Sequence, residues 1–159
     1  MDANTKSPAP MEALVGHFLG MPPVAALRPQ ILEWRDGLLR LRAPLDANVN
    51  DKGCAFGGST VSLMTIAAWG LVTLELEQAN LAAEVYVADS QIRYLKPVFE
   101  DIVVEAGFDT AADRAALVDT LARQGRAGAR LRARTLLADG GVAATFSGRY
   151  VAIGKAEAS

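Results

Sequence analysis

The feature that most constrains the fold is a run of twenty-two residues without a charged side chain, from Gly53 to Leu74. A polar loop precedes the apolar part of this run, which begins at Gly57-Gly58. The pattern predicts a long helix that starts at these glycines and ends near Gln78, with Glu75 and Glu77 marking its return to water. Because a helix that is apolar on all sides must be covered on all sides, the rest of the chain has to wrap around it.

The same run is long enough to cross a membrane, since a span needs about 20 mostly apolar residues. It contains nine Gly, Ser and Thr residues, however, and strand-like patterns surround it. We therefore expect the helix to be buried in a soluble, cytoplasmic protein with no membrane partner. The N-terminus lacks the apolar segment of a secretory signal. We expect residues 1–10 to be a disordered lead and residues 11–155 to form a single domain.

Composition excludes several classes of function. The 159 residues carry a net charge of −2, which argues against a nucleic-acid-binding protein. One histidine, His17, and one cysteine, Cys54, are too few for a zinc site. A single cysteine cannot form an internal disulfide, and this suits a reducing compartment. We therefore expect no metal site.

The remaining patterns predict an antiparallel sheet. Asp36-Gly37 separates two apolar segments, which is a strong signal for a hairpin turn. In the segment 86–94, alternation predicts that Tyr86 and Tyr94 share one face with the residues between them at even positions. The predicted strands cover residues 31–35, 38–42, 86–94, 102–108, 126–135 and 142–153, and short helical segments cover residues 11–19 and 113–123.

A series of short motifs runs along the chain in a fixed order. These are Ala43-Pro44-Leu45, Asn48-Val49-Asn50, Gly53, Phe56-Gly57-Gly58-Ser59, Ala68-Trp69-Gly70, Ala88–Tyr94, Pro97, Gly125-Arg126 and Phe146–Tyr150. Each is weak alone, but their order and spacing together resemble the hotdog-fold thioesterases, and in detail the YiiD C-terminal-domain family. The resemblance covers nearly the whole chain. It implies an α+β fold in which an antiparallel sheet of five to six strands wraps around one long central helix.

The resemblance implies hydrolysis of an acyl thioester, either acyl-CoA or acyl-ACP, at a site shared between subunits of a homodimer or a dimer of dimers. Coenzyme A enters only as part of the substrate, and no separate cofactor is implied. PaaI-type relatives carry Asn, then Gly, then His-Gly-Gly, then an acidic residue on the helix. Asn50 and Gly53 are in register with this pattern, but Phe56 stands in place of the histidine and Thr65 in place of the acid. The base is therefore unassigned by the resemblance.

For polarising the thioester carbonyl we expect the backbone amides of Gly57 and Gly58, aided by the helix dipole. The alternative is that both glycines only permit close contact between helix and sheet. For the base we expect Asp89, a carboxylate within a strand among apolar neighbours, where desolvation would raise its pKa. The alternatives for Asp89 are an ion pair with Arg93 or a position on a solvated face.

The other candidates have structural alternatives. Asn50 could position the water and Asn48 the thioester, or both could hold turns. Thr65 could bind substrate or, more in keeping with its type, bond back to its own helix. Cys54 could attack as a thiolate, but neutral packing is the favoured interpretation. Phe56 is expected to line the substrate site.

Arginines alternate with small apolar residues on one predicted strand and could meet the phosphates of coenzyme A. A solvated sheet face is the default interpretation of such a pattern. Arg126 is the preferred phosphate ligand because the Gly-Arg pair recurs in hotdog enzymes. The other members of the stripe are Arg130, Arg132 and Arg134.

Two other functions fit the chain less well. A non-catalytic acyl-CoA-binding module of the same fold is the main alternative, because the histidine and the acid of better-known relatives are missing. A dehydratase is disfavoured, because hotdog dehydratases use a catalytic histidine near the helix and none is present there.

Overall fold

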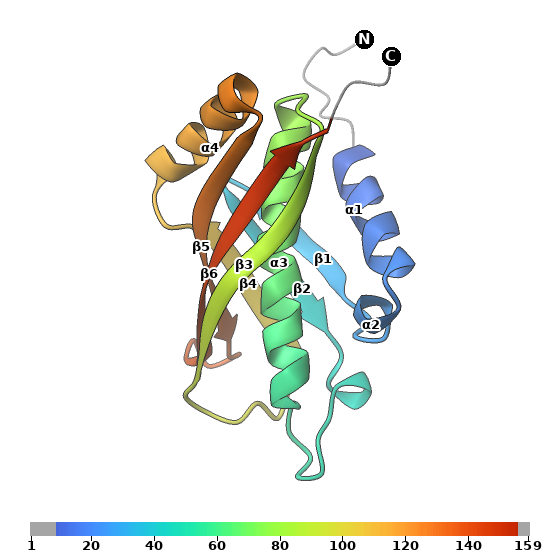
Figure 1. Ribbon diagram of the computed structural model, residues 1–159. Coiled ribbons are helices and arrows are strands. Elements are labelled where there is room, and N and C mark those ends of the chain that lie inside the picture. Colours follow the sequence, from blue (N-terminus) through green and yellow to red (C-terminus); the bar gives the residue numbers. More distant parts are fainter. Residues whose placement is uncertain (1–8, 156–159) are drawn as a thin grey trace.

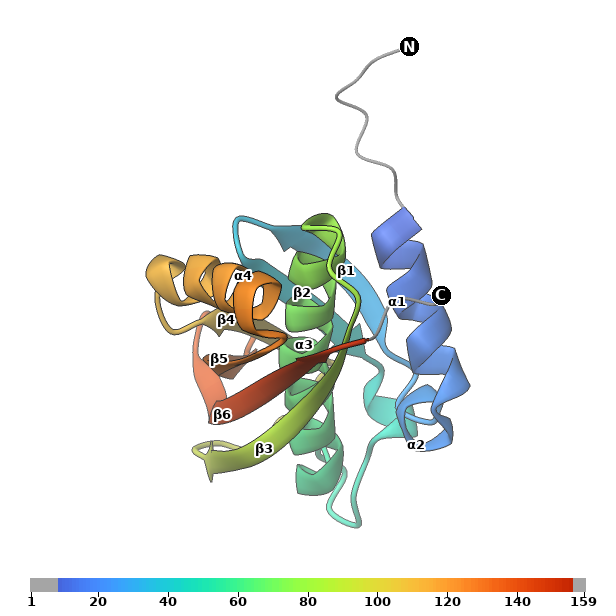
Figure 2. The ribbon, with the colours of Figure 1, turned by 45° about the horizontal axis from the view of Figure 1, so that its top comes forward.

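The central helix α3 (Gly57–Gln78) runs along the middle of the structure, and a curled sheet lies against it (Figure 1). The computed structural model describes residues 9–155. On the side that the sheet leaves open, α1 (Ala9–Gly20) and α2 (Pro22–Ala25) pack against α3, as Figure 2 shows. The predicted arrangement of a sheet around one helix is confirmed, and α3 begins and ends at the predicted residues. The expected lead lies outside the described residues except for its last two, which belong to α1.

Six strands of the described chain form one antiparallel sheet in the order β1-β2-β4-β5-β6-β3. The first and last strands in this order, β1 and β3, are its edges. Asp36 and Gly37 join β1 to β2 with φ angles of 53° and 72°, which fits a type I′ turn and confirms the predicted hairpin. The bounds are β1 (Gln30–Arg35), β2 (Leu38–Ala43), β3 (Ala83–Tyr94), β4 (Ile102–Phe108), β5 (Arg126–Leu136) and β6 (Val142–Gly154).

The connection from β4 to β5 is a full helix, α4 (Ala111–Gln124), slightly longer than predicted. Its start carries a capping box, in which the Thr110 hydroxyl accepts from the Asp113 amide and the Asp113 carboxylate accepts from the Thr110 amide, both at 3.1 Å. It ends at Gly125, whose φ of 73° suits glycine. Between β2 and α3 the chain makes one short 3₁₀ turn, η1 (Leu45–Ala47).

A bulge between Val87 and Asp89 reverses the alternation within β3. Before the bulge, Val87 stands opposite an inward-facing residue of β6, and after it Tyr94 does so. Tyr86 therefore points to the outer face of the sheet, whereas Tyr94 points to the helix. The expectation that Tyr86 and Tyr94 share one face is wrong, because Ala88 is an extra residue in the strand.

The C-terminal half of α3 forms the centre of the core. Residues of this half such as Leu71 and Leu74 are completely buried. Although α3 is long and apolar enough to cross a membrane, 67% of its most apolar window is buried inside the fold, so it is a core helix. Glu75 does not mark a return to water: it is 8% exposed and accepts a hydrogen bond from the Trp34 indole at 3.4 Å.

Candidate active site

The start of α3 leaves three backbone donors, the amides of Gly57, Gly58 and Ser59, without a partner in the described chain. Phe56 is the N-cap residue, in extended conformation, and its side chain makes no capping hydrogen bond. The first bond of the helix runs from the Thr60 amide to the Phe56 carbonyl, at 3.0 Å. Within residues 9–155, the amides of Gly57 and Gly58 meet no acceptor. With the positive end of the helix dipole behind them, these N–H groups can bind an oxygen that carries negative charge.

A cavity of about 350 Å³ opens beside this helix start. Gly57 and Thr60 line it from the helix, residues 94–98 from the end of β3 and the loop that follows, and residues 143–144 from β6. Lys96 is the one charged side chain of the lining, and no carboxylate or imidazole of the described chain lines it. The cavity therefore offers apolar surface and backbone donors, but within the described chain it contains no carboxylate or imidazole that could act as the base.

The loop before α3 is held by its two asparagines. The side-chain oxygen of Asn50 accepts from the amides of Lys52 and Cys54, at 2.8 and 3.1 Å. The Asn48 side chain is buried and donates to two backbone carbonyls, at 2.8 and 2.9 Å. In one chain both side chains thus perform the structural role, since they fix the loop that leads into the helix.

Tyr94 contacts the helix start and was missed as a site residue. Its hydroxyl donates a hydrogen bond to the Gly57 carbonyl at 2.7 Å. Its ring lies so close that a Cβ atom at position 57 would be 3.3 Å from it. Desolvation of the phenol raises the pKa of Tyr94 above its ordinary value, so the hydroxyl remains a donor. The sequence placed Tyr94 at a strand end, but nothing in it indicated that the hydroxyl would meet a glycine.

Three other candidates lie near the helix and make local contacts. The exposed ring of Phe56 covers Gly58, where an added Cβ atom would lie 2.5 Å from the ring. The Thr65 hydroxyl donates to the Val61 carbonyl at 2.7 Å, which is the back-bonded alternative. Cys54 is buried, and its sulfur accepts a hydrogen bond from the Asn50 side-chain nitrogen at 3.3 Å, as expected for a packing role.

Asp89 lies on the outer face of β3, away from the helix start. Its partner is Arg149 of β6, at 3.0 Å, and not Arg93. The Asp89 side chain is 58% exposed, so the expected apolar surroundings are not found in the single chain. Five residues of strand, about 16 Å, separate Asp89 from Tyr94. One chain therefore does not bring Asp89 and Gly57 together.

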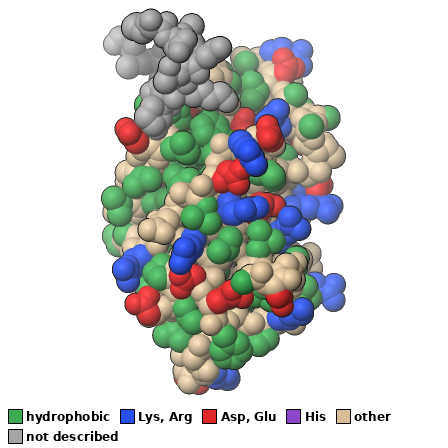
Figure 3. Space-filling model, turned by 180° about the vertical axis from the view of Figure 1, so that it is seen from behind, with side chains coloured by type: hydrophobic (Ala, Val, Ile, Leu, Met, Phe, Trp, Pro, Cys, Tyr) green, Lys and Arg blue, Asp and Glu red, His purple; other side chains and the backbone are tan. Residues whose placement is uncertain are grey.

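The arginines of β5 point outward, as their alternation predicted. Arg130, Arg132 and Arg134 each contact a polar or acidic side chain nearby. Arg126 has no such partner within the described chain, but it lies at the far end of the sheet: nine residues of β5, about 30 Å, separate it from the cavity end. Figure 3, which shows the molecule from behind, has basic and acidic side chains next to one another on the side that it shows.

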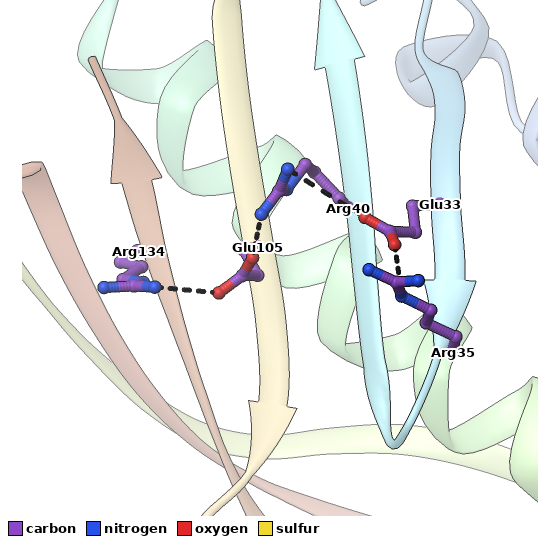
Figure 4. A network of polar contacts seen from close by, with 5 residues as sticks. All are labelled: Glu33, Arg35, Arg40, Glu105 and Arg134. Atoms are coloured by element: carbon purple, nitrogen blue, oxygen red, sulfur yellow. Dashed lines mark hydrogen bonds and ion pairs between the residues drawn. The ribbon is translucent and has the colours of Figure 1, made fainter. Parts of the chain in front are cut away.

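A polar network centred on Glu105 of β4 crosses the outer face (Figure 4). Glu105 accepts from Arg40 of β2 at 2.5 Å and from Arg134 of β5 at 3.0 Å. Arg40 also lies 3.9 Å from Glu33 of β1, which pairs with Arg35. Burial alone would raise the pKa of Glu105, but the hydrogen bonds from the two arginines outweigh it and lower the pKa below its ordinary value. The network joins four strands on the face away from the cavity.

The family described as "Putative thioesterase (yiiD_Cterm)" matches residues 20–154. The chain belongs to this family. The matched segment includes the helix start, the cavity lining and all six strands. Membership confirms the resemblance that the motifs indicated and places the free amides of α3 in a thioesterase fold.

Solved structures agree with this assignment. A "putative thioesterase" from Shewanella oneidensis is 29% identical, with a TM-score of 0.81, over 92% of this chain and 99% of that chain. A protein of unknown function from Chlorobaculum tepidum TLS is 26% identical, with a TM-score of 0.83, over 91% of this chain and 94% of that chain. The PaaI protein from the E. coli phenylacetic acid degradation operon is 14% identical, with a TM-score of 0.65, over 89% and 91% of the two chains. The PaaI likeness shows the hotdog fold alone.

Proposed function

We propose that this thioesterase-family protein hydrolyses acyl-CoA or acyl-ACP thioesters and binds the thioester carbonyl with the amides of Gly57 and Gly58. The observation that carries the proposal is that these donors meet no acceptor in the described chain, while Gly57 lines a cavity. The carbonyl oxygen becomes negatively charged in the tetrahedral intermediate, and donors already in place stabilise that charge. The family supplies the class of reaction, and the helix start supplies a place for it.

The proposal includes a second copy of the chain, because one copy separates the predicted site residues. β3 is an edge strand of 12 residues that pairs with β6 on one side, and it exposes Tyr86 and Val87. Unpaired edges of this length are normally covered. Antiparallel pairing of two β3 strands would put the far end of one sheet beside the cavity end of the other. It would thereby move Arg126 of a second copy towards Gly57, whereas the second copy's Asp89, near the middle of β3, would approach Gly57 only if the two strands paired through their halves after the bulge.

In this arrangement the chemistry is a simple hydrolysis. Asp89 of the second copy takes a proton from water, and the water oxygen attacks the thioester carbon held at the amides. The intermediate then expels the sulfur as a thiolate, which takes up a proton, to give a carboxylic acid and a free thiol. Phe56 and Thr65 lie along the path of the acyl group, and Arg126 binds the coenzyme phosphates. Asn50 and Asn48 hold the loop against the bound thioester. Cys54 as the only cysteine suits the cytoplasm.

A non-catalytic acyl-CoA-binding module is the second candidate. The observation that favours it is the cavity lining, which contains no carboxylate or imidazole of the described chain. Release of free thiol over a panel of acyl-CoAs of increasing chain length separates the two functions. Hydrolysis by the wild-type protein supports the thioesterase, whereas a rise in Tm with acyl-CoA and no turnover supports the binding module.

A matched pair of variants at position 57 tests the amide itself. Gly57→Pro removes one N–H group, and proline is tolerated here because Gly57 is the first residue of the helix and Phe56 is already extended, with a ψ of 129°. Gly57→Ala adds a Cβ atom but keeps the N–H group. We expect kcat of the Pro variant to be about 10²–10³ lower than that of the Ala variant. Equal rates in the two variants would exclude the Gly57 amide from the mechanism.

A further inference from the structure

One peptide group of the helix start is held by a side chain from another element. The carbonyl of Gly57 and the amide of Gly58 belong to the same planar peptide. Glycine has the widest choice of backbone angles, so local sterics hold this peptide, which joins two glycines, less firmly than others in the helix. The Tyr94 hydroxyl donates to its carbonyl oxygen at 2.7 Å, and the Tyr94 ring fills the space beside Gly57. Fixing the oxygen of a planar group also fixes the direction of its N–H bond.

The hydrogen bond has an electronic effect as well. A carbonyl that accepts a hydrogen bond is polarised, and the N–H group of the same peptide then becomes a better donor. We propose that Tyr94 is a positioning residue, which orients and polarises the Gly57–Gly58 peptide so that the Gly58 amide binds the thioester oxygen. This inference rests on the proposed function, because the thioester is the ligand of that amide.

The chain contains a natural control for this role. Tyr150 also donates to a carbonyl of α3, that of Thr65, and at the same distance of 2.7 Å. Tyr150 is 1% exposed and belongs to the core, whereas Tyr94 is 55% exposed and borders the cavity. Replacing each tyrosine with phenylalanine removes one hydroxyl and keeps the ring. Tyr150→Phe therefore measures the loss of a hydrogen bond to the helix alone, whereas Tyr94→Phe also removes the contact that orients the Gly57–Gly58 peptide.

The sequence allows the peptide to be observed directly. The chain has two Gly-Gly pairs, Gly57-Gly58 and Gly140-Gly141. Glycine labelled with ¹³C at the carbonyl and with ¹⁵N therefore gives two signals in an NMR spectrum that correlates each amide with the preceding carbonyl. In Tyr94→Phe we expect the Gly57-Gly58 signal to shift in both dimensions and the Gly140-Gly141 signal to stay in place. An unmoved Gly57-Gly58 signal would overturn the inference, whether or not the protein hydrolyses thioesters.

Kinetics of the full-length protein test the consequence for turnover. In Tyr94→Phe we expect kcat to fall about tenfold with little change in KM or Tm, because the donor is still present but no longer oriented. In Tyr150→Phe we expect a lower Tm and an unchanged kcat. An unchanged kcat in Tyr94→Phe, or a loss of Tm equal to that in Tyr150→Phe, would reduce Tyr94 to a structural residue. If the wild-type protein does not hydrolyse any thioester, the proposed function fails, while the NMR result still decides whether Tyr94 controls the peptide.

Discussion

The two ends of α3 treat their backbone groups in opposite ways. At the C-terminal end the chain turns back and satisfies the last carbonyls, for example by the Leu81 amide, which donates to the Leu76 carbonyl at 2.9 Å. Around this end the helix is buried, and even Glu75 is held inside by Trp34. At the N-terminal end, the amide of Gly58 and that of the glycine before it meet no acceptor in the described chain.

This difference shows that the buried C-terminal half of the helix supplies stability that the N-terminal end lacks. Each glycine in place of alanine costs up to about 1 kcal/mol in a helix interior, and a missing N-cap side chain costs about 1 kcal/mol more. Each fully buried leucine of the C-terminal half contributes about 1.5–3 kcal/mol. The buried C-terminal half, called here the closed half, can therefore stabilise a helix whose N-terminal end, the open end, has two glycines and no side-chain cap. The open end is left free for a ligand.

The largest effect expected is at Asp89, because the open end needs a base from outside the chain that forms it. Asp89→Asn should lower kcat by about 10²–10⁴ and leave folding intact, since the side chain is exposed. Thiol release and circular dichroism measure the two effects. Arg149→Met is the control, because it breaks the ion pair and keeps the carboxylate. A near-normal rate in Asp89→Asn would remove this residue from the mechanism.

The same variant shows whether the site is shared. Subunits of Asp89→Asn mixed with subunits of Gly57→Pro should regain part of the activity, because a mixed dimer assembles one site from two intact halves. No recovery after verified subunit exchange would place both residues in the site of one chain, or remove one of them from it.

The next effect in size is on stability, in the closed half. Leu71→Ala removes a completely buried side chain and should lower the free energy of unfolding by about 2–5 kcal/mol, with kcat per folded molecule unchanged. Ser62→Ala is the control, because Ser62 is exposed on the same helix and should change stability by less than about 0.5 kcal/mol. Denaturant unfolding gives both values. Equal losses would abolish the contrast between the two ends.

The smallest effect belongs to the network on the outer face. The pKa of Glu105 is lower in the folded chain than its ordinary value of 4.5, so the ionised carboxylate stabilises the fold above pH 4.5 and this stabilisation is lost as the pH falls through the folded pKa. Glu105→Gln should therefore cost about 2 kcal/mol at pH 7, and the difference from wild type should shrink below pH 4.5. Tm measured across this range provides the check, with no change in kcat at pH 7. A difference in Tm that does not depend on pH would assign the loss to packing.

The sequence predicted the parts of the fold that have a local or periodic cause. An uncharged run bounded by Gly57-Gly58 requires a buried helix, and Asp36-Gly37 favours one type of hairpin. The direction of the β3 side chains could not be predicted, because an extra residue at Ala88 leaves no signal in an exposed strand of mixed composition. Glu75 was misplaced because its burial depends on Trp34, a partner from another element.

In the candidate site, too, the features with a local cause could be predicted and those that depend on tertiary contacts could not. The free amides follow from the helix start, which is local. The surroundings of Asp89 depend on the bulge and on Arg149, and the contact of Tyr94 with Gly57 joins segments 37 residues apart. Such contacts are decided by tertiary packing, and neither periodicity nor composition records them.

The bulge in β3 affects how this chain can be matched with its relatives. A sequence alignment that follows only the alternation of apolar residues is correct on one side of Ala88 and shifted by one position on the other. Loss of this one residue would remove the bulge and leave the pairs on either side of it unchanged, with Val87 opposite Tyr150 and Asp89 still facing outward opposite Arg149. A single codon gained or lost at this point can thus change the spacing of the strand residues in the sequence without exchanging those that border the cavity with those that meet solvent.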